Sequence, residues 1–95
     1  MHMSDDGPSW IRIIDENSGI IWGEVHIHAA RSGMDPDDLR QDAMLSLWTS
    51  RDEIVRLSAD EASRLIRVIV RRRCIDACRR ETRHRVPNYG LEVER

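Results

Sequence analysis

Two helix-start signals constrain the fold of this 95-residue chain more than any other feature of its sequence. Asp35 is a favourable N-cap residue, and Pro36 fits the first position of the helix that follows. Ser58 and Glu61 have the spacing of a capping box, in which each side chain bonds to the other residue's backbone. The sequence therefore predicts that one helix begins at Asp35 and another at Ser58.

Apolar residues at helical spacing follow both signals and also precede the first one. Residues 10–30 form the first such segment, which Asn17-Ser18-Gly19 and Gly23 weaken or split and Arg31-Ser32-Gly33 ends. The second helix is predicted to run to about Arg51 with the apolar face Leu39, Ala43, Met44, Leu47 and Trp48. The third is predicted to run to about Arg83 with the core face Ala62, Leu65, Ile66, Ile69 and Val70.

The stretches between and beyond these helices carry other signals. Arg51–Leu57 is predicted as a loop. After Ile69 the last helix becomes cationic on all sides, so this part is predicted to project past the core. Residues 1–9 are expected to be a disordered leader, residues 10–85 the helical domain, and residues 86–95 a linker or tail.

These patterns together predict an all-α domain of three to four helices with a long C-terminal basic helix. The length suits one small domain, and the chain contains no strand pattern. It has no run of about 18 apolar residues and no basic segment followed by an apolar one at its start. We therefore expect a cytoplasmic monomer without a membrane contact.

The net charge of −2 conceals two halves of opposite sign. Residues 1–63 carry five Arg against thirteen Asp and Glu, and residues 64–95 carry ten Arg against four acids. There is no Lys, and Arg is the better residue for phosphates and base edges because its planar guanidinium forms two parallel hydrogen bonds. The balances of −8 and +6 suggest two partners, one cationic and one polyanionic.

Enzymatic or metal chemistry is not favoured. The chain has no glycine-rich phosphate loop, no nucleophile elbow and no zinc-type spacing of Cys and His. His26 and His28 are two residues apart and would face different directions on a helix. Cys74, Cys78 and His84 leave a metal or redox site open, although cysteine is more often a small packing residue. We expect no catalytic residue and no cofactor.

The arginine cluster is the strongest functional signal in the residues themselves. Nine Arg lie between Arg64 and Arg85, against only Asp76 and Glu81. This composition favours a nucleic-acid partner, with a protein or acidic peptide as the alternative. Phosphate contacts alone would be unspecific, since sequence is read through base contacts.

Two segments resemble a known family. Residues 38–48, DLRQDAMLSLW, resemble the D-L-x-Q-[ED]-x-[FM]-L-x-L-W segment of bacterial sigma factors. Residues 65–80, LIRVIVRRRCIDACRR, resemble the W-L-x-x-I-A-R-N-x-A-I-D-x-L-R-R segment downstream. Both occur in the order and at the spacing of region 2 in extracytoplasmic-function (ECF) sigma factors, and the resemblance covers roughly residues 20–85.

The resemblance implies two interfaces and the residues that form them. The first binds the β′ clamp helices of the RNA polymerase core and would comprise Asp38, Gln41, Asp42, Leu45 and Trp48. The second recognises and melts the promoter −10 element by holding the non-template strand and a flipped base. It would draw on the loop residues Ile54, Val55, Arg56 and Ser58 and on the helix residues Arg64, Arg67, Arg71, Arg72 and Arg79. An anti-sigma factor is a further candidate partner.

The sequence departs from the family pattern at two positions, Leu65 for the motif's Trp and Arg72 for its Asn. In the family the Trp supports strand opening and the Asn helps to bind the captured base. The resemblance therefore leaves open whether this chain melts promoter DNA. Because His2-Met3 resembles a cloning remnant, we expect one domain of a larger factor that carries a second, −35-binding domain. Two alternatives remain: a small helical DNA-binding regulator without polymerase contact, and a sigma-like decoy that binds only protein.

Overall fold

Five α-helices make up the part of the chain that the computed structural model describes, which is the backbone of residues 6–85 and the side chains of residues 10–80. They are α1 (Asp6–Glu16), α2 (Ser18–Ser32), α3 (Pro36–Thr49), α4 (Arg51–Val55) and α5 (Ala59–Arg85). The all-α prediction is confirmed, with more helices than expected. The first helix begins at Asp6, inside the predicted leader, while the rest of that leader and the predicted tail of residues 86–95 lie outside the described residues.

Both predicted helix starts are present with their capping hydrogen bonds. The Asp35 carboxylate accepts from the backbone N–H of Asp37 at 2.9 Å. At the start of α5, the Glu61 N–H donates to the Ser58 hydroxyl and the Ser58 N–H donates to the Glu61 carboxylate, both at 3.2 Å. These bonds satisfy backbone donors that the first turn of a helix leaves without partners.

The break between α1 and α2 lies at Asn17, whose side chain is buried. Its amide nitrogen donates to the carbonyl of Ile13 at 2.8 Å, and its oxygen accepts from the Ser63 hydroxyl of α5 at 2.7 Å. The buried amide is thus hydrogen-bonded on both sides, as a buried polar group must be to avoid a desolvation cost. At the other end of α2, Gly33 adopts a left-handed φ of 75°, and its N–H closes the helix on the Ala29 carbonyl at 2.8 Å.

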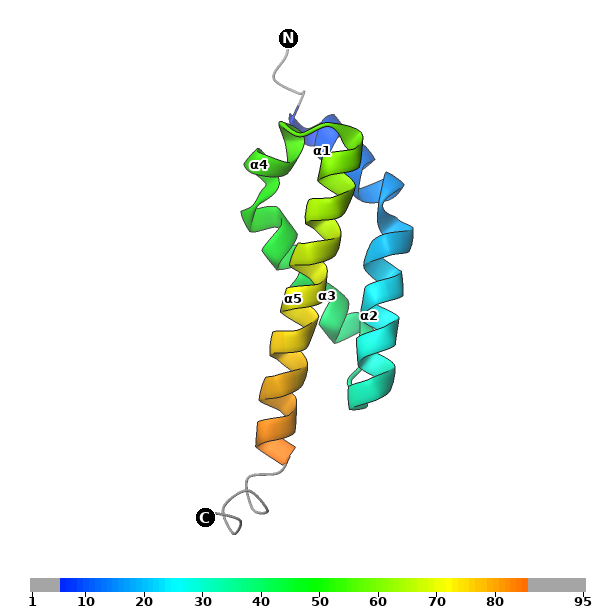
Figure 1. The fold of residues 1–95 in the computed structure, drawn as a ribbon, viewed down its shortest axis with the longest axis vertical. Helices are drawn as coiled ribbons and strands as arrows, with labels where there is room; N and C mark the ends of the chain where they lie inside the picture. Colours follow the sequence, from blue (N-terminus) through cyan, green and yellow to red (C-terminus); the bar gives the residue numbers. More distant parts are fainter. Residues whose placement is uncertain (1–5, 86–95) are drawn as a thin grey trace.

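The core lies where α2, α3 and α5 pack along one another, with α1 and α4 at the end where α5 begins (Figure 1). The largest fully buried side chains come from all three long helices and from α4: Leu39, Leu47, Ile54, Ile66, Val25, Val70 and Cys74. Each such aliphatic side chain contributes about 1.5–3 kcal/mol by leaving water. Aliphatic packing therefore holds the bundle, with no aromatic residue among these seven.

Two predictions about local structure were wrong. The segment predicted as the loop Arg51–Leu57 contains α4, because Ile54 is fully buried and fixes a helical turn against the core. The last helix also stays packed beyond Ile69, since Val70, Cys74 and Ala77 are buried. Their spacing of four and three residues continues the core stripe between the arginines.

No helix within residues 6–85 is long and apolar enough to cross a lipid bilayer.

Candidate functional site

The outer face of α3 is free of core contacts and carries three of the predicted polymerase-binding residues. Asp38, Gln41 and Leu45 are exposed, and the side chain of Leu45 is 64% accessible. They follow one another at spacings of three and four residues, so they share a side of the helix. The buried residues Leu39 and Ala43 lie on the other side. This face is therefore available for a contact with another helix.

Asp42 lies at the edge of this face and also belongs to the fold. Its carboxylate is half-buried, and its Oδ1 is 3.9 Å from the guanidinium Nη2 of Arg73 in α5. The ion pair links α3 to α5 while leaving about a third of each side chain accessible. Because the pair is this long and partly solvated, its contribution to stability is small.

Trp48 lies at the rim of the bundle rather than inside it. The side chain is 50% exposed, although the sequence pattern places it on the apolar face of the helix. Its ring meets that of Trp10 from α1 edge to face, with centroids 6.1 Å apart and an interplanar angle of 71°. The guanidinium of Arg51 lies 3.7 Å from the centre of the Trp48 ring, in cation–π geometry. The indole is therefore held from two sides and still presents one side to solvent.

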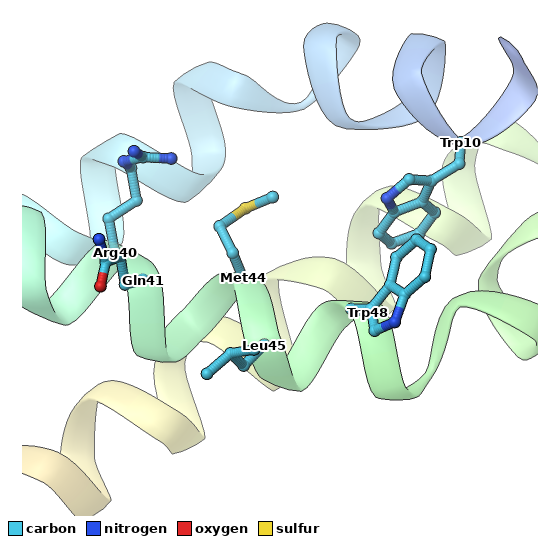
Figure 2. Close-up of a pocket in the computed structure, with 6 residues that line it drawn as sticks. All are labelled: Trp10, Arg40, Gln41, Met44, Leu45 and Trp48. Carbon is cyan, nitrogen blue, oxygen red and sulfur yellow. The ribbon is translucent and has the colours of Figure 1, made fainter. Parts of the chain in front are cut away.

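A cavity of about 390 Å³ opens beside Trp48 on this part of α3 (Figure 2). Figure 2 shows Trp10 descending from α1 onto Trp48, with Met44 and Leu45 further along α3. The lining residues are Trp10, Arg40, Gln41, Met44, Leu45 and Trp48. Three of them are predicted polymerase-binding residues, so the cavity and the predicted interface overlap.

The connection from α4 to α5 contributes fewer surface residues than predicted. Arg56 and Ser58 are exposed, and Ser58 is also the N-cap of α5. Val55 is half-buried and packs against the core. Ile54 was wrongly predicted as a DNA-contacting residue: its side chain has no accessible surface, so it is a core residue of α4.

The predicted DNA-binding arginines of α5 form two neighbouring rows along the helix. Arg64, Arg67 and Arg71 share the side of α5 that faces α2, where Arg67 lines a hollow together with residues of that helix. Arg72 and Arg79 are exposed and lie seven residues apart, two turns along another side. The predicted DNA-binding arginines thus surround more than one face of the helix.

Arg71 is engaged by α2. Its guanidinium forms two hydrogen bonds with the carboxylate of Glu24, at 2.9 and 3.4 Å. The hydrogen bond from Arg71 lowers the pKa of Glu24 below its ordinary value, against an opposing effect of burial. Glu24 also lies 3.5 Å from the imidazole of His28, one turn along α2. The side chain of Arg71 remains 51% exposed, so a second anion can still approach it.

Sequence reasoning did not single out Glu24, Trp10 or Arg73 as part of these surfaces. Glu24 and Arg71 are 47 residues apart in the chain, and no local sequence pattern predicts an ion pair between residues that far apart. Trp10 was assigned to the first helix, but its contact with Trp48 depends on how α1 crosses the end of the bundle. The structure also shows the two residues that depart from the family pattern. Leu65 is half-buried and packs against the core, and Arg72 is exposed.

The cysteine pair on α5 has the properties of packing residues. Cys74 is fully buried, and burial raises the pKa of its thiol to about 11. Cys78 is half-exposed, and its thiol lies 3.7 Å from the carbonyl of His28. Across the described side chains, no three His, Cys, Asp or Glu residues are arranged to hold a metal ion. The side chain of His84, which the sequence pattern placed near this pair, lies outside the described residues.

Comparison with known proteins identifies the family of the chain. The family model for sigma-70 region 2 matches residues 14–84. No curated protein and no solved structure gave a match. The matched range contains α2 to α4 and nearly all of α5, including the exposed face of α3 and both arginine rows. The chain therefore belongs to the sigma-70 region 2 family, whose members are transcription initiation domains with a role in RNA polymerase binding and promoter recognition.

Proposed function

We propose that this chain is region 2 of an ECF-type sigma factor, which binds the β′ clamp helices through α3 and the promoter −10 element through α5 and the loop before it. The observation that carries this proposal is the outer face of α3. There Asp38, Gln41 and Leu45 are exposed at helical spacing and make no contribution to the core. Leu45 and Trp48, one turn apart on α3, are both large apolar side chains that are at least half exposed, and such a patch within a region 2 match supports a protein partner.

The charge of α3 supports a basic helical partner. Its first turn carries Asp37 and Asp38, and Asp42 follows one turn later with its carboxylate partly accessible. Acidic residues on one helix attract a basic helix during the encounter and fix its register. The apolar residues Leu45 and Trp48 follow at the other end of the same helix, where burial supplies affinity.

Binding to a β′ clamp-helix fragment tests the α3 interface. We expect the double variant Asp38→Ala/Gln41→Ala to lower the affinity at least tenfold, since polar contacts at an interface contribute about 1–2 kcal/mol or more. Asp60→Ala is the matched control, because it removes the same charge from the first turn of α5, a helix outside the proposed α3 interface. Equal binding by the double variant and the wild type would refute this interface.

The arginines of α5 support binding of a single strand. Arg64 and Arg67 are exposed on the side facing α2, and Arg56 extends the positive surface to the α4–α5 loop. Arginine neutralises phosphates and stacks on unpaired bases, which are the two contributions that a melted strand offers. Arg72 stands where the motif has Asn, and we propose that it contacts a phosphate or a guanine of the non-template strand.

Fluorescence anisotropy with a −10-like single-stranded oligonucleotide tests the DNA interface. The affinity should fall steeply with salt, by a slope of about 0.7 per phosphate contact on a logarithmic plot. Arg64→Ala/Arg67→Ala should reduce that slope by about one unit or more, whereas Arg31→Ala on α2 should leave it unchanged. Equal affinity for random duplex would instead indicate a general DNA-binding regulator, and absence of DNA binding at low salt would indicate a protein-binding decoy.

A further inference from the structure

We propose that Trp10 of α1 completes an apolar receptor site on the polymerase-binding face, which accepts an apolar side chain of the partner helix. This inference rests on the proposed function and adds to it a residue that lies outside the matched range of residues 14–84. The site is the cavity of about 390 Å³ between α1 and α3 (Figure 2).

The walls of this cavity are apolar and are held in place. Met44, Leu45 and the two indoles supply most of the lining, and the edge-to-face contact of Trp10 with Trp48 fixes the angle between them. Arg51 packs over Trp48 from outside the cavity, at 3.7 Å from the ring centre. A preorganised pocket loses little entropy on binding, which makes it an efficient anchor.

A second hollow of about 410 Å³ continues the first toward α2. It shares Trp10, Arg40 and Met44 with the first cavity and adds the side chains of Ile14 and Trp22. Arg40 lies 5.1 Å from the centre of the Trp22 ring and lines both hollows. A groove with mainly apolar walls therefore runs along α1 past Trp10, with Asp15, Ser18 and Arg40 as polar residues of its second hollow.

Continuity with the acidic face of α3 identifies the occupant. Gln41, Leu45 and Trp48 belong both to the cavity lining and to the proposed polymerase interface, so a helix that covers one covers the other. The cavity lies about two turns, or 10 Å, beyond Asp38 along α3. Because Arg40 and Arg51 flank it, a cationic side chain is disfavoured there. The partner helix should thus present a basic residue opposite Asp38 and, about two turns further, a Leu, Ile or Met that enters the cavity.

Binding of the chain to intact RNA polymerase core tests this site. Met44→Gln puts a polar group into the cavity at a residue that is not part of the proposed polar interface, and Trp10→Ala removes the α1 wall. Both should weaken binding about 10- to 30-fold, as expected for an anchor residue in a desolvated pocket. Ile27→Ala is the control, because Ile27 is a half-exposed residue on α2 away from the cavity and should leave the affinity unchanged.

The outcomes separate this inference from the function on which it rests. Trp10 is largely buried, so circular dichroism of each variant must show native helicity; if Trp10→Ala unfolds, Met44→Gln decides. If both pocket variants fold and bind core with wild-type affinity while Asp38→Ala/Gln41→Ala loses binding, the receptor site is refuted. The proposed function is then still supported. Absence of core binding by the wild type overturns both. If sedimentation shows a dimer that the pocket variants abolish while core binding persists, the occupant is a second copy and the inference is wrong.

Discussion

The hydrogen bonds of Asn17 give the sharpest prediction about stability. Asn17→Ala removes the bond to the Ile13 carbonyl and the bond from the Ser63 hydroxyl, at 2.8 and 2.7 Å. Each is worth about 1 kcal/mol, and truncation of the buried side chain adds to the loss, so we expect the free energy of unfolding to fall by about 2–3 kcal/mol. That is a large share of the stability of a domain this small.

Urea unfolding followed by far-ultraviolet circular dichroism measures this loss. With an m-value of about 1 kcal/mol per molar urea for a domain of this size, the midpoint should move down by about 2–3 M. Ser63→Ala should cost about 1 kcal/mol, because it leaves the Asn17 oxygen without a donor while Ala favours the helix slightly. The double variant should then lose about 1 kcal/mol less than the two single losses added together.

The control for this cycle is Ser18→Ala, which changes the exposed neighbour of Asn17 and should stay within about 0.5 kcal/mol of the wild type. A loss below about 0.5 kcal/mol for Asn17→Ala, or a coupling energy near zero, would refute the view that this amide joins the α1–α2 break to α5.

Three further predictions concern single groups of the fold. Near neutral pH a maleimide should label the native chain once, at Cys78, and the chain unfolded in urea twice. The reason is that Cys74 is buried and its thiol pKa is raised to about 11. Rapid labelling of both cysteines in the native chain would contradict this. Glu24 has a folded pKa below its ordinary 4.5, so its stabilising effect is full above that value and is lost as the pH falls through the folded pKa. Urea unfolding from neutral pH to about pH 3 should therefore show Glu24→Gln less stable than the wild type only at the higher pH, and a gap that persists in acid would argue against the pair with Arg71. Ser58→Ala should lower the free energy of unfolding by about 1 kcal/mol, and an unchanged thermal midpoint would show that the capping box is not needed.

The features that sequence predicted well are those set by neighbours along the chain. Asp35 and Ser58 were identified as caps because capping depends on residues two or three positions away, and both bonds are present. The break at Asn17 was also foreseen within the segment Asn17-Ser18-Gly19, although Gly23 does not interrupt α2. The resemblance of residues 38–48 and 65–80 to region 2 is likewise local, and the family match confirms it.

The features that sequence missed depend on packing between distant segments. α4 is a helix of five residues held by the burial of Ile54, and so short a helix has too few residues to show a period. The core stripe of α5 continues through Cys74 and Ala77, but this was not predicted because each of these residues has a charged neighbour in the sequence. For the candidate interfaces, the residue types could be predicted from the sequence. The cavity at Trp10 and the pairing of Arg71 with Glu24 could not, because both depend on how the helices cross in the folded chain.

The length of α5 sets a fixed spacing for whatever binds along it. Its 27 residues contain neither Gly nor Pro, and its inner side is packed from Ala62 to Ala77, so there is no position at which it can bend easily. At 1.5 Å per residue, Arg64 and Arg79 are about 22 Å apart along the axis, which equals six to seven nucleotide steps of about 3.4 Å. A strand bound along α5, as proposed above, would therefore have to adapt its own path to the helix, so the distortion would fall on the nucleic acid and not on the protein.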